Sequence, residues 1–311
     1  MQFGTKSSTE RAKTEPTTRR VLQEELFSTA DGMATLTARG HLVYKKLESI
    51  FLEWASMTNA SSIRYPALIR VSDLDRLNYF RNFPQLVLCV CAMDGSAHAG
   101  HGQRQEDIGS LDRSDLGNAE FCLPPAACYN VYLSLRGQNL FTSQHVTTAG
   151  AFFRNEDHYD GLRRLRAFTL REIVCVGDSD AVKSHLRKYK AIALEFLKHL
   201  GLPVTVDKAS DPFFDKDGTA ARAARIFPTK EEILYRDTLA IGSVNYHRRF
   251  FGERCEITFN GEPAHTGCIG FGIERWIQAL SENFGSDADY ISAELASAQA
   301  KLTSRAGEYL S

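Results

Sequence analysis

The chain has 311 residues, of which 43% are hydrophobic and 24% are charged, an ordinary composition for a globular protein. Lys and Arg number 37 against 38 Asp and Glu, so the net charge of -1 provides no general attraction for nucleic acid. No apolar run is long enough to cross a bilayer, and the N-terminus lacks the apolar centre of a secretory signal. These features predict a cytoplasmic protein without a membrane partner.

The predicted elements begin after residues 1–20, a polar stretch without apolar periodicity that is expected to be a disordered tail before one domain at 21–311. From Gly40 onward, apolar residues recur at helical spacing as far as Trp54. A second helix is predicted from Val182 to Leu200, since glycine and proline follow it. Strand-like runs occupy residues 86–93, 127–135, 151–156, 165–177 and 255–261, and an insertion is expected at about 203–235.

The order of these elements indicates the fold class. Too few helices separate the strands for repeated βαβ units, so an α+β fold with a mainly antiparallel sheet flanked by helices is expected. The seven cysteines include no CxxC pair, which indicates neither a disulfide framework nor a zinc ribbon.

One segment, residues 151–178, combines strand alternation with charge. If two strands surround a charged loop, Arg154 and Glu156 share one face of the first strand. On the second strand, one face carries Arg164, Arg166, Phe168, Leu170 and Glu172. Two arginines, an aromatic ring and a carboxylate make a poor core face. The same pattern would also fit an exposed polar face of an antiparallel sheet, so both interpretations stay open.

A second segment, CIGFGIERWIQAL at residues 268–280, passes from a glycine-rich strand end into an amphipathic helix that begins near Ile273. Arg275 falls in the first turn, where the helix dipole disfavours a cation. Its presence indicates that an anion such as phosphate completes a site there. The glycines could instead serve only close packing, and no GK[ST] follows them as in a P-loop.

Together, FRNE, the pair Arg164 and Phe168, and GFGIER resemble motifs 2 and 3 of class II aminoacyl-tRNA synthetases, in order and register. The narrower likeness is to the zinc-dependent, atypical seryl-tRNA synthetases and to their truncated relatives, the amino acid:[carrier protein] ligases. It rests on LNYFRNFPQL, LPPAACYNVYLSLRG, DPFF at 211–214 and SVNYHRRFFG at 243–252, and covers most of residues 40–285. The resemblance implies the class II catalytic fold for residues 21–311 and a homodimer.

The resemblance also implies a zinc site. In the family, two cysteines and a glutamate hold the metal, and the matching positions here are Cys128, Glu172 and Cys268. Three protein ligands leave one coordination position open, as in catalytic zinc sites, and the amino group of the substrate would take it. The alternative is three unrelated buried groups.

For ATP, the resemblance implies that Phe168 stacks on adenine and that Glu156 accepts from the exocyclic amine. Arg154 matches the arginine that contacts the α-phosphate and the attacking carboxylate, and Arg164 and Arg275 would hold the terminal phosphates. Charge neutralisation and positioning are what such a displacement at phosphorus needs.

The run CEITFNG at 255–261 would add two further groups. Alternation along a strand places Glu256, Thr258 and Asn260 on one face. Glu256 matches the glutamate of the family that holds Mg²⁺ on the phosphates, and Asn260 would face the substrate. The alternative for Glu256 is an exposed strand carboxylate.

The implied activity is ATP-dependent activation of a small amino acid, glycine or alanine, as an aminoacyl adenylate. A phosphopantetheine thiol on a carrier protein would then capture the acyl group. Only about forty residues precede the first helix of the predicted domain, so the large N-terminal tRNA-binding domain of seryl-tRNA synthetases is not expected. The alternatives are tRNA aminoacylation with an RNA-binding part from another subunit, and an inactive regulatory paralogue. The expected carrier surface is DPFF with residues 219–227, including Arg222 and Arg225.

Overall fold

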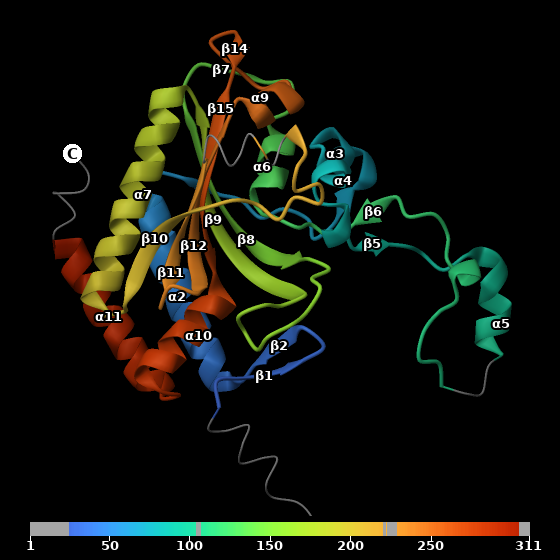
Figure 1. Cartoon of the computed structure of the whole chain (residues 1–311), viewed down its shortest axis with the longest axis horizontal. Coiled ribbons are helices and arrows are strands. Elements are labelled where there is room, and N and C mark those ends of the chain that lie inside the picture. The colour runs from blue at the N-terminus through green and yellow to red at the C-terminus, as the bar shows by residue number, and fades with distance from the viewer. Residues whose placement is uncertain (1–24, 104–106, 220–221, 223–228, 305–311) are drawn as a thin grey trace, which may run out of the picture.

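The computed structural model describes residues 25–103, 107–219, 222 and 229–304 (Figure 1). The predicted tail at residues 1–20 lies outside the described residues. The strands are β1 (Phe27–Ala30), β2 (Met33–Leu36), β3 (Ser61–Ser62), β4 (Ile69–Arg70), β5 (Cys89–Val90), β6 (Phe121–Cys122), β7 (Asn139–Leu140), β8 (Gln144–Phe153), β9 (Ala167–Gly177), β10 (Val204–Ala209), β11 (Lys230–Tyr235), β12 (Leu239–Arg248), β13 (Thr258–Phe259), β14 (Glu262–Pro263) and β15 (His265–Gly272).

The α-helices are α2 (Ala38–Ser56), α3 (Val71–Arg76), α4 (Tyr79–Asn82), α5 (His98–Gly102), α6 (Cys128–Ser134), α7 (Ser179–His199), α9 (Phe250–Arg254), α10 (Ile273–Phe284) and α11 (Ala288–Ser304). Short 3-10 helices are η1 (Pro84–Leu86), η2 (Gly95–Ala97) and η3 (Arg113–Asp115). Within the described residues, no helix is long and apolar enough to cross a membrane.

A seven-stranded sheet in the order β10-β11-β12-β15-β9-β8-β3 forms the centre of the fold. All neighbouring strands in it run antiparallel, except that the two-residue strand β3 runs parallel to β8. Figure 1 shows α7 and α11 on one side of the sheet and α6, α3 and α4 on the other. The expected α+β fold, a mainly antiparallel sheet flanked by helices, is confirmed.

Side chains that alternate along the strands supply two separate cores. Ile173 and Cys175 of β9 pack with α2, α7, α10 and α11 in the larger core. In that core, the rings of Phe51 and Phe271 stack with centroids 4.5 Å apart. Val174 and Val176 face the opposite side, where they pack with residues of α6 and α9. One face of the sheet is therefore a continuous apolar layer, and the other face is shared between a smaller core and the cavity described below.

Both predicted helices are present. In α2, the residues at helical spacing from Val43 to Trp54 are buried, and the hydroxyl of Thr37 caps the N-terminus by accepting from the Gly40 amide at 3.2 Å. In α7, the carboxylate of Asp178 caps the N-terminus in the same way, and Gly201 with φ +66° follows the end.

Two predicted strand runs have a different structure. Residues 127–135 contain the helix α6, because the residues buried there, Cys128, Val131 and Tyr132, follow helical spacing. A short apolar run does not by itself distinguish a buried helix from a strand. In residues 255–261, only Thr258 and Phe259 are in a strand.

The range 203–235, expected to be an insertion, contributes two strands to the central sheet. β10 and β11 pair with each other across all six residues of each strand, and β11 then pairs with β12. Most of residues 219–227, which include Arg225, lie outside the described residues, and Arg222 is exposed. The boundaries of the domain and of the insertion stay predictions.

A buried ion pair links the central sheet to α2. The Nε of Arg171 on β9 donates to both carboxylate oxygens of Glu48, at 3.0 and 3.2 Å, and the side chain of Arg171 is 7% exposed. The Nη1 of Arg171 donates to the hydroxyl of Thr147 on β8 at 3.1 Å. Two strands and a helix therefore meet at this guanidinium.

Glu48→Ala is expected to lower the free energy of unfolding by about 3 kcal/mol, because it leaves the Arg171 charge buried without its partner. The measurement is urea unfolding followed by circular dichroism. Glu231→Ala breaks a more exposed pair with Lys190, 2.7 Å long, and should cost less than about 1 kcal/mol. Equal losses in the two variants would contradict the assignment.

Candidate active site

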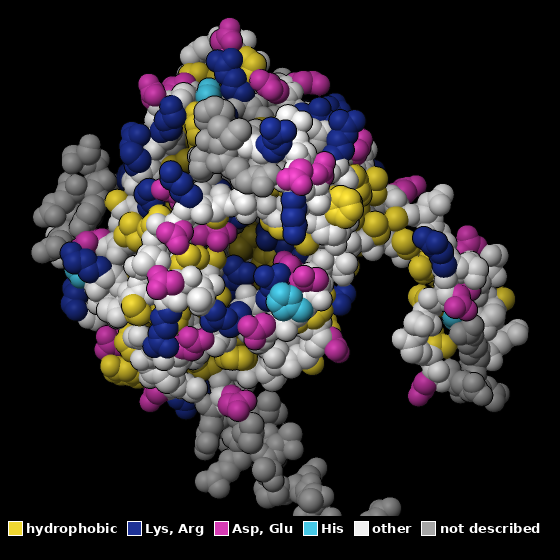
Figure 2. Space-filling view, viewed as in Figure 1, with side chains coloured by type: hydrophobic (Ala, Val, Ile, Leu, Met, Phe, Trp, Pro, Cys, Tyr) yellow, Lys and Arg dark blue, Asp and Glu magenta, His cyan; other side chains and the backbone are white. Residues whose placement is uncertain are grey.

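A cavity opens on the face of the central sheet that lies opposite the larger core. Figure 2 shows the molecule hollowed near its centre, with Lys and Arg side chains gathered beside the hollow. Eight of the ten site residues predicted from the sequence line this cavity. They are Cys128, Arg154, Glu156, Arg164, Phe168, Glu172, Cys268 and Arg275. The segments that carried the two sequence motifs therefore meet at one place.

Strand register brings polar groups together in two neighbouring rows on the cavity face. In the first row, Glu172 of β9 lies opposite Gly270 of β15, which lies opposite Ser243 of β12, which lies opposite Glu232 of β11. In the second row, Cys268 of β15 lies opposite Asn245 of β12, which lies opposite Lys230 of β11. Because alternate residues share a face, every one of these side chains points into the cavity.

Gly270 provides the space that the first row needs. A Cβ atom at this position would lie 3.2 Å from Cγ of Glu172 and 3.4 Å from Oγ of Ser243. Any larger residue would push the glutamate out of its place. The glycine-rich sequence before α10 therefore has a packing role next to the site, as one of the two interpretations of that motif proposed.

Four arginines line the cavity: Arg154, Arg163 and Arg164 from the connection between β8 and β9, and Arg275 from α10. Arg275 lies in the first turn of α10, as expected, and its guanidinium donates to the carbonyl oxygens of Arg163 at 2.9 Å and Ala240 at 3.1 Å. Burial lowers its pKa, and the neighbouring charge of Arg154 lowers it further. Among the described residues, neither Arg154 nor Arg275 forms an ion pair with a carboxylate. Positive charge that lacks a counter-ion in a cavity favours a bound anion.

Phe168 and Glu156 lie beside these arginines. The guanidinium of Arg154 lies over the ring of Phe168, 5.2 Å from its centroid, and its Nε donates to the carbonyl of Pro125 at 3.2 Å. Arg164 Nη1 forms an ion pair of 3.0 Å with Glu156. The result is a flat apolar surface edged by one carboxylate and two arginines, which can accept a planar ring that carries an anionic tail.

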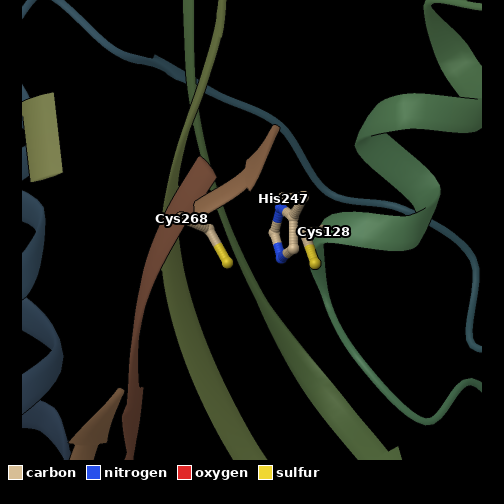
Figure 3. A group of neighbouring side chains, drawn as sticks. All are labelled: Cys128, His247 and Cys268. Atoms are coloured by element: carbon tan, nitrogen blue, oxygen red, sulfur yellow. The ribbon is translucent and has the colours of Figure 1, made fainter. Parts of the chain in front are cut away.

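At the inner end of the cavity, two thiols, an imidazole and a carboxylate gather. Potential ligand atoms of Cys128, His247 and Cys268 all lie within 4.8 Å of one another, and Figure 3 shows the imidazole ring between the two sulfur atoms. Glu172 accepts from the backbone amide of Cys128 at 3.0 Å and forms hydrogen bonds with both thiols. The three predicted zinc ligands are therefore neighbours, and His247 is a fourth donor that the sequence analysis did not assign.

The protonation of this group reflects its burial. The Cys128 thiol forms a hydrogen bond with Cys268 and is buried, and both effects raise its pKa well above the usual value. Burial raises the pKa of Glu172 and lowers the pKa of His247 to about 4. Without a cation the two thiols and the imidazole are therefore neutral near pH 7, and a divalent ion is what would ionise the thiols. Soft thiolates with imidazole and carboxylate suit zinc.

A buried charge network forms another wall. The ammonium of Lys230 forms ion pairs with Asp211 and Glu232, both 3.0 Å long. Burial alone would lower the pKa of Lys230, but these two carboxylates outweigh it, and the pKa is raised. Asp211 belongs to the DPFF segment, which is expected to contact a carrier protein, and in the structure it lines the cavity.

The structure does not bring Glu256 and Asn260 to the cavity. Both residues have positive φ angles, +56° and +51°, so the expected strand alternation does not apply to them. The side chain of Glu256 is 65% exposed and forms an ion pair with Arg76 at 3.6 Å. In the described part of the chain, the cavity wall includes neither residue. This is the exposed carboxylate that was the alternative for Glu256.

The site residues missed from the sequence come from β11, β12 and the DPFF segment. Ser243, Asn245 and His247 alternate along SVNYH, so a polar period of two was present as a signal. Lys230 and Glu232 carried no such signal, because Glu231 between them is charged as well. Which face they occupy depends on pairing with β15, which no local pattern shows.

Comparison with known proteins shows the family to which the chain belongs. Residues 112–284 match the family described as tRNA synthetase class II core domain (G, H, P, S and T). The chain is 31% identical over 290 residues to "Amino acid--[acyl-carrier-protein] ligase 1" of Bradyrhizobium diazoefficiens, with 86% of this chain and 85% of the relative covered. It belongs to this ligase family, within the class II synthetase fold. Ligase 2 of the same organism is 33% identical over 249 residues, which cover 74% of this chain and 71% of the relative.

A solved structure supports the fold. The crystal structure of M. kandleri SerRS in complex with A. aeolicus tRNASec superposes on this chain with a TM-score of 0.71 at 18% identity. The superposition covers 90% of this chain but 63% of that chain, so this chain spans less than two thirds of the synthetase. The likeness at this identity extends to the fold of the family and not to the activity of the whole synthetase.

Inorganic pyrophosphate is expected to bind the cavity, and Arg275→Gln should weaken that binding about tenfold or more. The reason is that a hydrogen bond to a charged group contributes about 1.5 to 3 kcal/mol. Isothermal titration calorimetry measures the effect. Arg236→Gln is the control, because Arg236 is 54% exposed and its ion pair with Glu282 is 4.0 Å long. Unchanged binding in Arg275→Gln would exclude this arginine from the anion site.

Proposed function

We propose that this protein activates a small amino acid with ATP and transfers it to the phosphopantetheine thiol of a carrier protein. The observation that carries the proposal is the meeting of eight motif-derived residues in one cavity, where unpaired arginines, an aromatic surface and a cluster of metal-ligating groups adjoin. The names of the two Bradyrhizobium relatives, both amino acid--[acyl-carrier-protein] ligases, support the same acceptor. Glycine and alanine stay the predicted amino acids.

The first step joins amino acid and nucleotide. A carboxylate oxygen of the amino acid attacks the α-phosphorus of ATP, the bond to the β-phosphate oxygen breaks, and pyrophosphate leaves. The proposed role of Arg154 is to neutralise charge at the α-phosphate, and that of Arg164 and Arg275 is to hold the terminal phosphates. The attacking group is already an anion, so no side chain is needed to remove a proton.

The nucleotide base is proposed to lie on Phe168. The ring lies beside Arg154 at the cavity wall, and Glu156 is close enough to Arg164 for an ion pair of 3.0 Å. Glu156 would accept from the exocyclic amine of adenine, which selects it over a base with a carbonyl there. Stacking on an aromatic side chain is worth about 1 to 3 kcal/mol for a nucleic-acid base.

Zinc is proposed to be held by Cys128, Glu172 and Cys268, and the imidazole of His247 lies beside the two thiols. When bound, zinc would supply a Lewis-acid position for the amino group of the substrate. His247 accepts from, or donates to, the hydroxyl of Tyr132 at 3.2 Å through Nδ1, which fixes the plane of its ring. Glu256 and Asn260 have no place in the proposed site, and Mg²⁺ would enter with the phosphates of ATP.

In the second step, the carrier thiol attacks the acyl carbon of the adenylate as a thiolate, a thioester forms and AMP leaves. The proton of the thiol goes to solvent before the attack. The net charge of -1 provides no general attraction for tRNA, which agrees with a protein acceptor. A homodimer and a cytoplasmic location stay predictions from the sequence.

Cys268→Ser is expected to bind one zinc ion fewer per chain than the unchanged protein, because a soft thiolate contributes strongly to zinc affinity. Metal analysis by mass spectrometry after gel filtration measures this. Cys255→Ser is the matched control, since Cys255 is also buried on this side of the sheet but lies outside the cluster. Full zinc content in Cys268→Ser would remove this residue from the ligand set.

The function is tested in two stages. Exchange of labelled pyrophosphate into ATP should depend on glycine or alanine, and a purified phosphopantetheinylated carrier protein should then become labelled by the amino acid through a thiol-labile bond. Bulk tRNA, offered under the same conditions, should gain little label. Labelled tRNA without labelled carrier would replace the ligase proposal with tRNA aminoacylation, and no exchange with any amino acid would favour the regulatory paralogue.

A further inference from the structure

A second group of metal-ligating side chains lies on the other face of the sheet. His145 of β8 and Cys175 of β9 are direct cross-strand partners, and α7 packs over them and adds His185. Ligand atoms of the three residues all lie within 4.8 Å of one another. We propose that His145, Cys175 and His185 bind a divalent transition-metal ion, with zinc as the ion that their chemistry favours, at a site separate from the cavity.

The distances suit a tetrahedral ion. Zinc bonds to imidazole nitrogen at about 2.0 to 2.1 Å, so two nitrogen ligands of a tetrahedral ion lie about 3.3 to 3.4 Å apart. The Nδ1 atoms of His145 and His185 are 3.2 Å apart. Sulfur and nitrogen ligands would be about 3.6 Å apart, which a side-chain movement of about 1 Å achieves from the present spacing. The backbone therefore already presents the ligands at the required separation.

The orientation of His185 supports ligation through Nδ1. Its Nε2 lies 3.2 Å from the carbonyl oxygen of Ile173, an atom that can only accept, so Nε2 carries the proton. In the neutral ring, Nδ1 then has a lone pair that accepts from Nδ1 of His145, 3.2 Å away, and an ion would take this lone pair once the proton of His145 moves to Nε2. Metal-ligating histidines commonly donate their other nitrogen to a backbone carbonyl in this way.

Negative groups around the site offset part of the positive charge when Cys175 binds as a thiolate. Lys188 lies one turn along α7 from His185, and its ammonium donates to the carbonyl of Met57 at 3.2 Å. Its repulsion of a cation is opposed by the Cys175 thiolate and by Asp178, whose charge acts on Cys175. Binding releases the thiol proton to solvent, and both imidazoles bind in their neutral form.

An ion, and a water molecule as its fourth ligand, would reach the group on the side of His145. Cys175 and His185 are buried, whereas His145 is half-buried at the edge of the group. An ion can reach the three ligands along His145, and a water molecule can complete its coordination. The site would join two strands and a helix next to Glu172, which lies three residues before Cys175 and faces the cavity. Its role would be structural, and it would exist whether or not the proposed ligase activity does.

The test is the zinc content of single variants purified in zinc-containing medium. His145→Gln should contain one zinc ion fewer per chain than the unchanged protein. His41→Gln should keep the full content, because His41 is exposed on α2 and only stacks on Tyr44. If His145→Gln keeps the same zinc content as the unchanged protein, the three residues form a hydrogen-bonded core group and the proposal is wrong.

A cobalt experiment separates the two groups of ligands without relying on enzyme activity. With Cys128→Ser and Cys268→Ser combined, the cavity has no thiolate. The part of any cobalt–thiolate charge-transfer band that is lost when Cys175 is also replaced comes from Cys175, because Cys89, Cys91, Cys122 and Cys255 are retained in both variants. The band should persist in that variant and disappear when Cys175→Ala is added. Its absence from the variant that retains Cys175, with circular dichroism showing a folded chain, would overturn the proposal. If that variant does not fold, His145→Gln in the unchanged chain gives the same decision by reducing the band.

Discussion

The register of four antiparallel strands is the constraint on which the rest of the molecule depends. Because β9, β15, β12 and β11 keep one register along these rows, residues far apart in the sequence line up across the sheet, such as Glu172, Gly270, Ser243 and Glu232. A slip of one residue would turn these side chains into the apolar core and bring Ile269 and Ile173 to the cavity. The large helical core on the opposite face fixes that choice, since it buries the other half of each strand.

The apolar packing of this fold therefore offsets the free-energy cost of burying charged and polar groups in the cavity. The cavity holds the guanidinium of Arg275, which burial and Arg154 both disfavour as a cation, and two buried thiols beside the carboxylate of Glu172. Partly buried charges such as those of Arg154 and Arg275, which form no direct ion pair among the described residues, are tolerated because the surrounding core is large. They are also the charges that a nucleotide and a metal ion would compensate, so the binding energy of those ligands includes the relief of this repulsion.

The predictions that succeeded rest on local patterns. Alternation placed Phe168, Leu170 and Glu172 on one face of β9, and the helical period located α2 and α7, since both patterns are properties of a single element. The predictions that failed assumed the wrong type of secondary structure. Glu256 and Asn260 would share a face only in a strand, and their positive φ angles belong to turns.

Other parts of the site required information that no single segment contains. Asp211 reaches the cavity through its ion pair with Lys230, and Lys230 faces the cavity because β11 pairs with β12. His247 approaches the thiols from β12, whereas Cys128 arrives on α6, which was expected to be a strand. These placements depend on how elements pack against one another, so the sequence alone indicated the residue types without their arrangement.

The guanidinium over Phe168 has a consequence for the order in which parts of a nucleotide can engage. Arg154 covers one face of the ring and is tied to the carbonyl of Pro125, so an aromatic base can occupy that face only when the arginine turns away. A phosphate group is the partner that can draw it off, since an anion binds a guanidinium more strongly than a ring does. Under the proposed function, the phosphates of a nucleotide would therefore bind Arg154 before the base occupies that face of the ring, and a nucleoside without phosphates would bind more weakly.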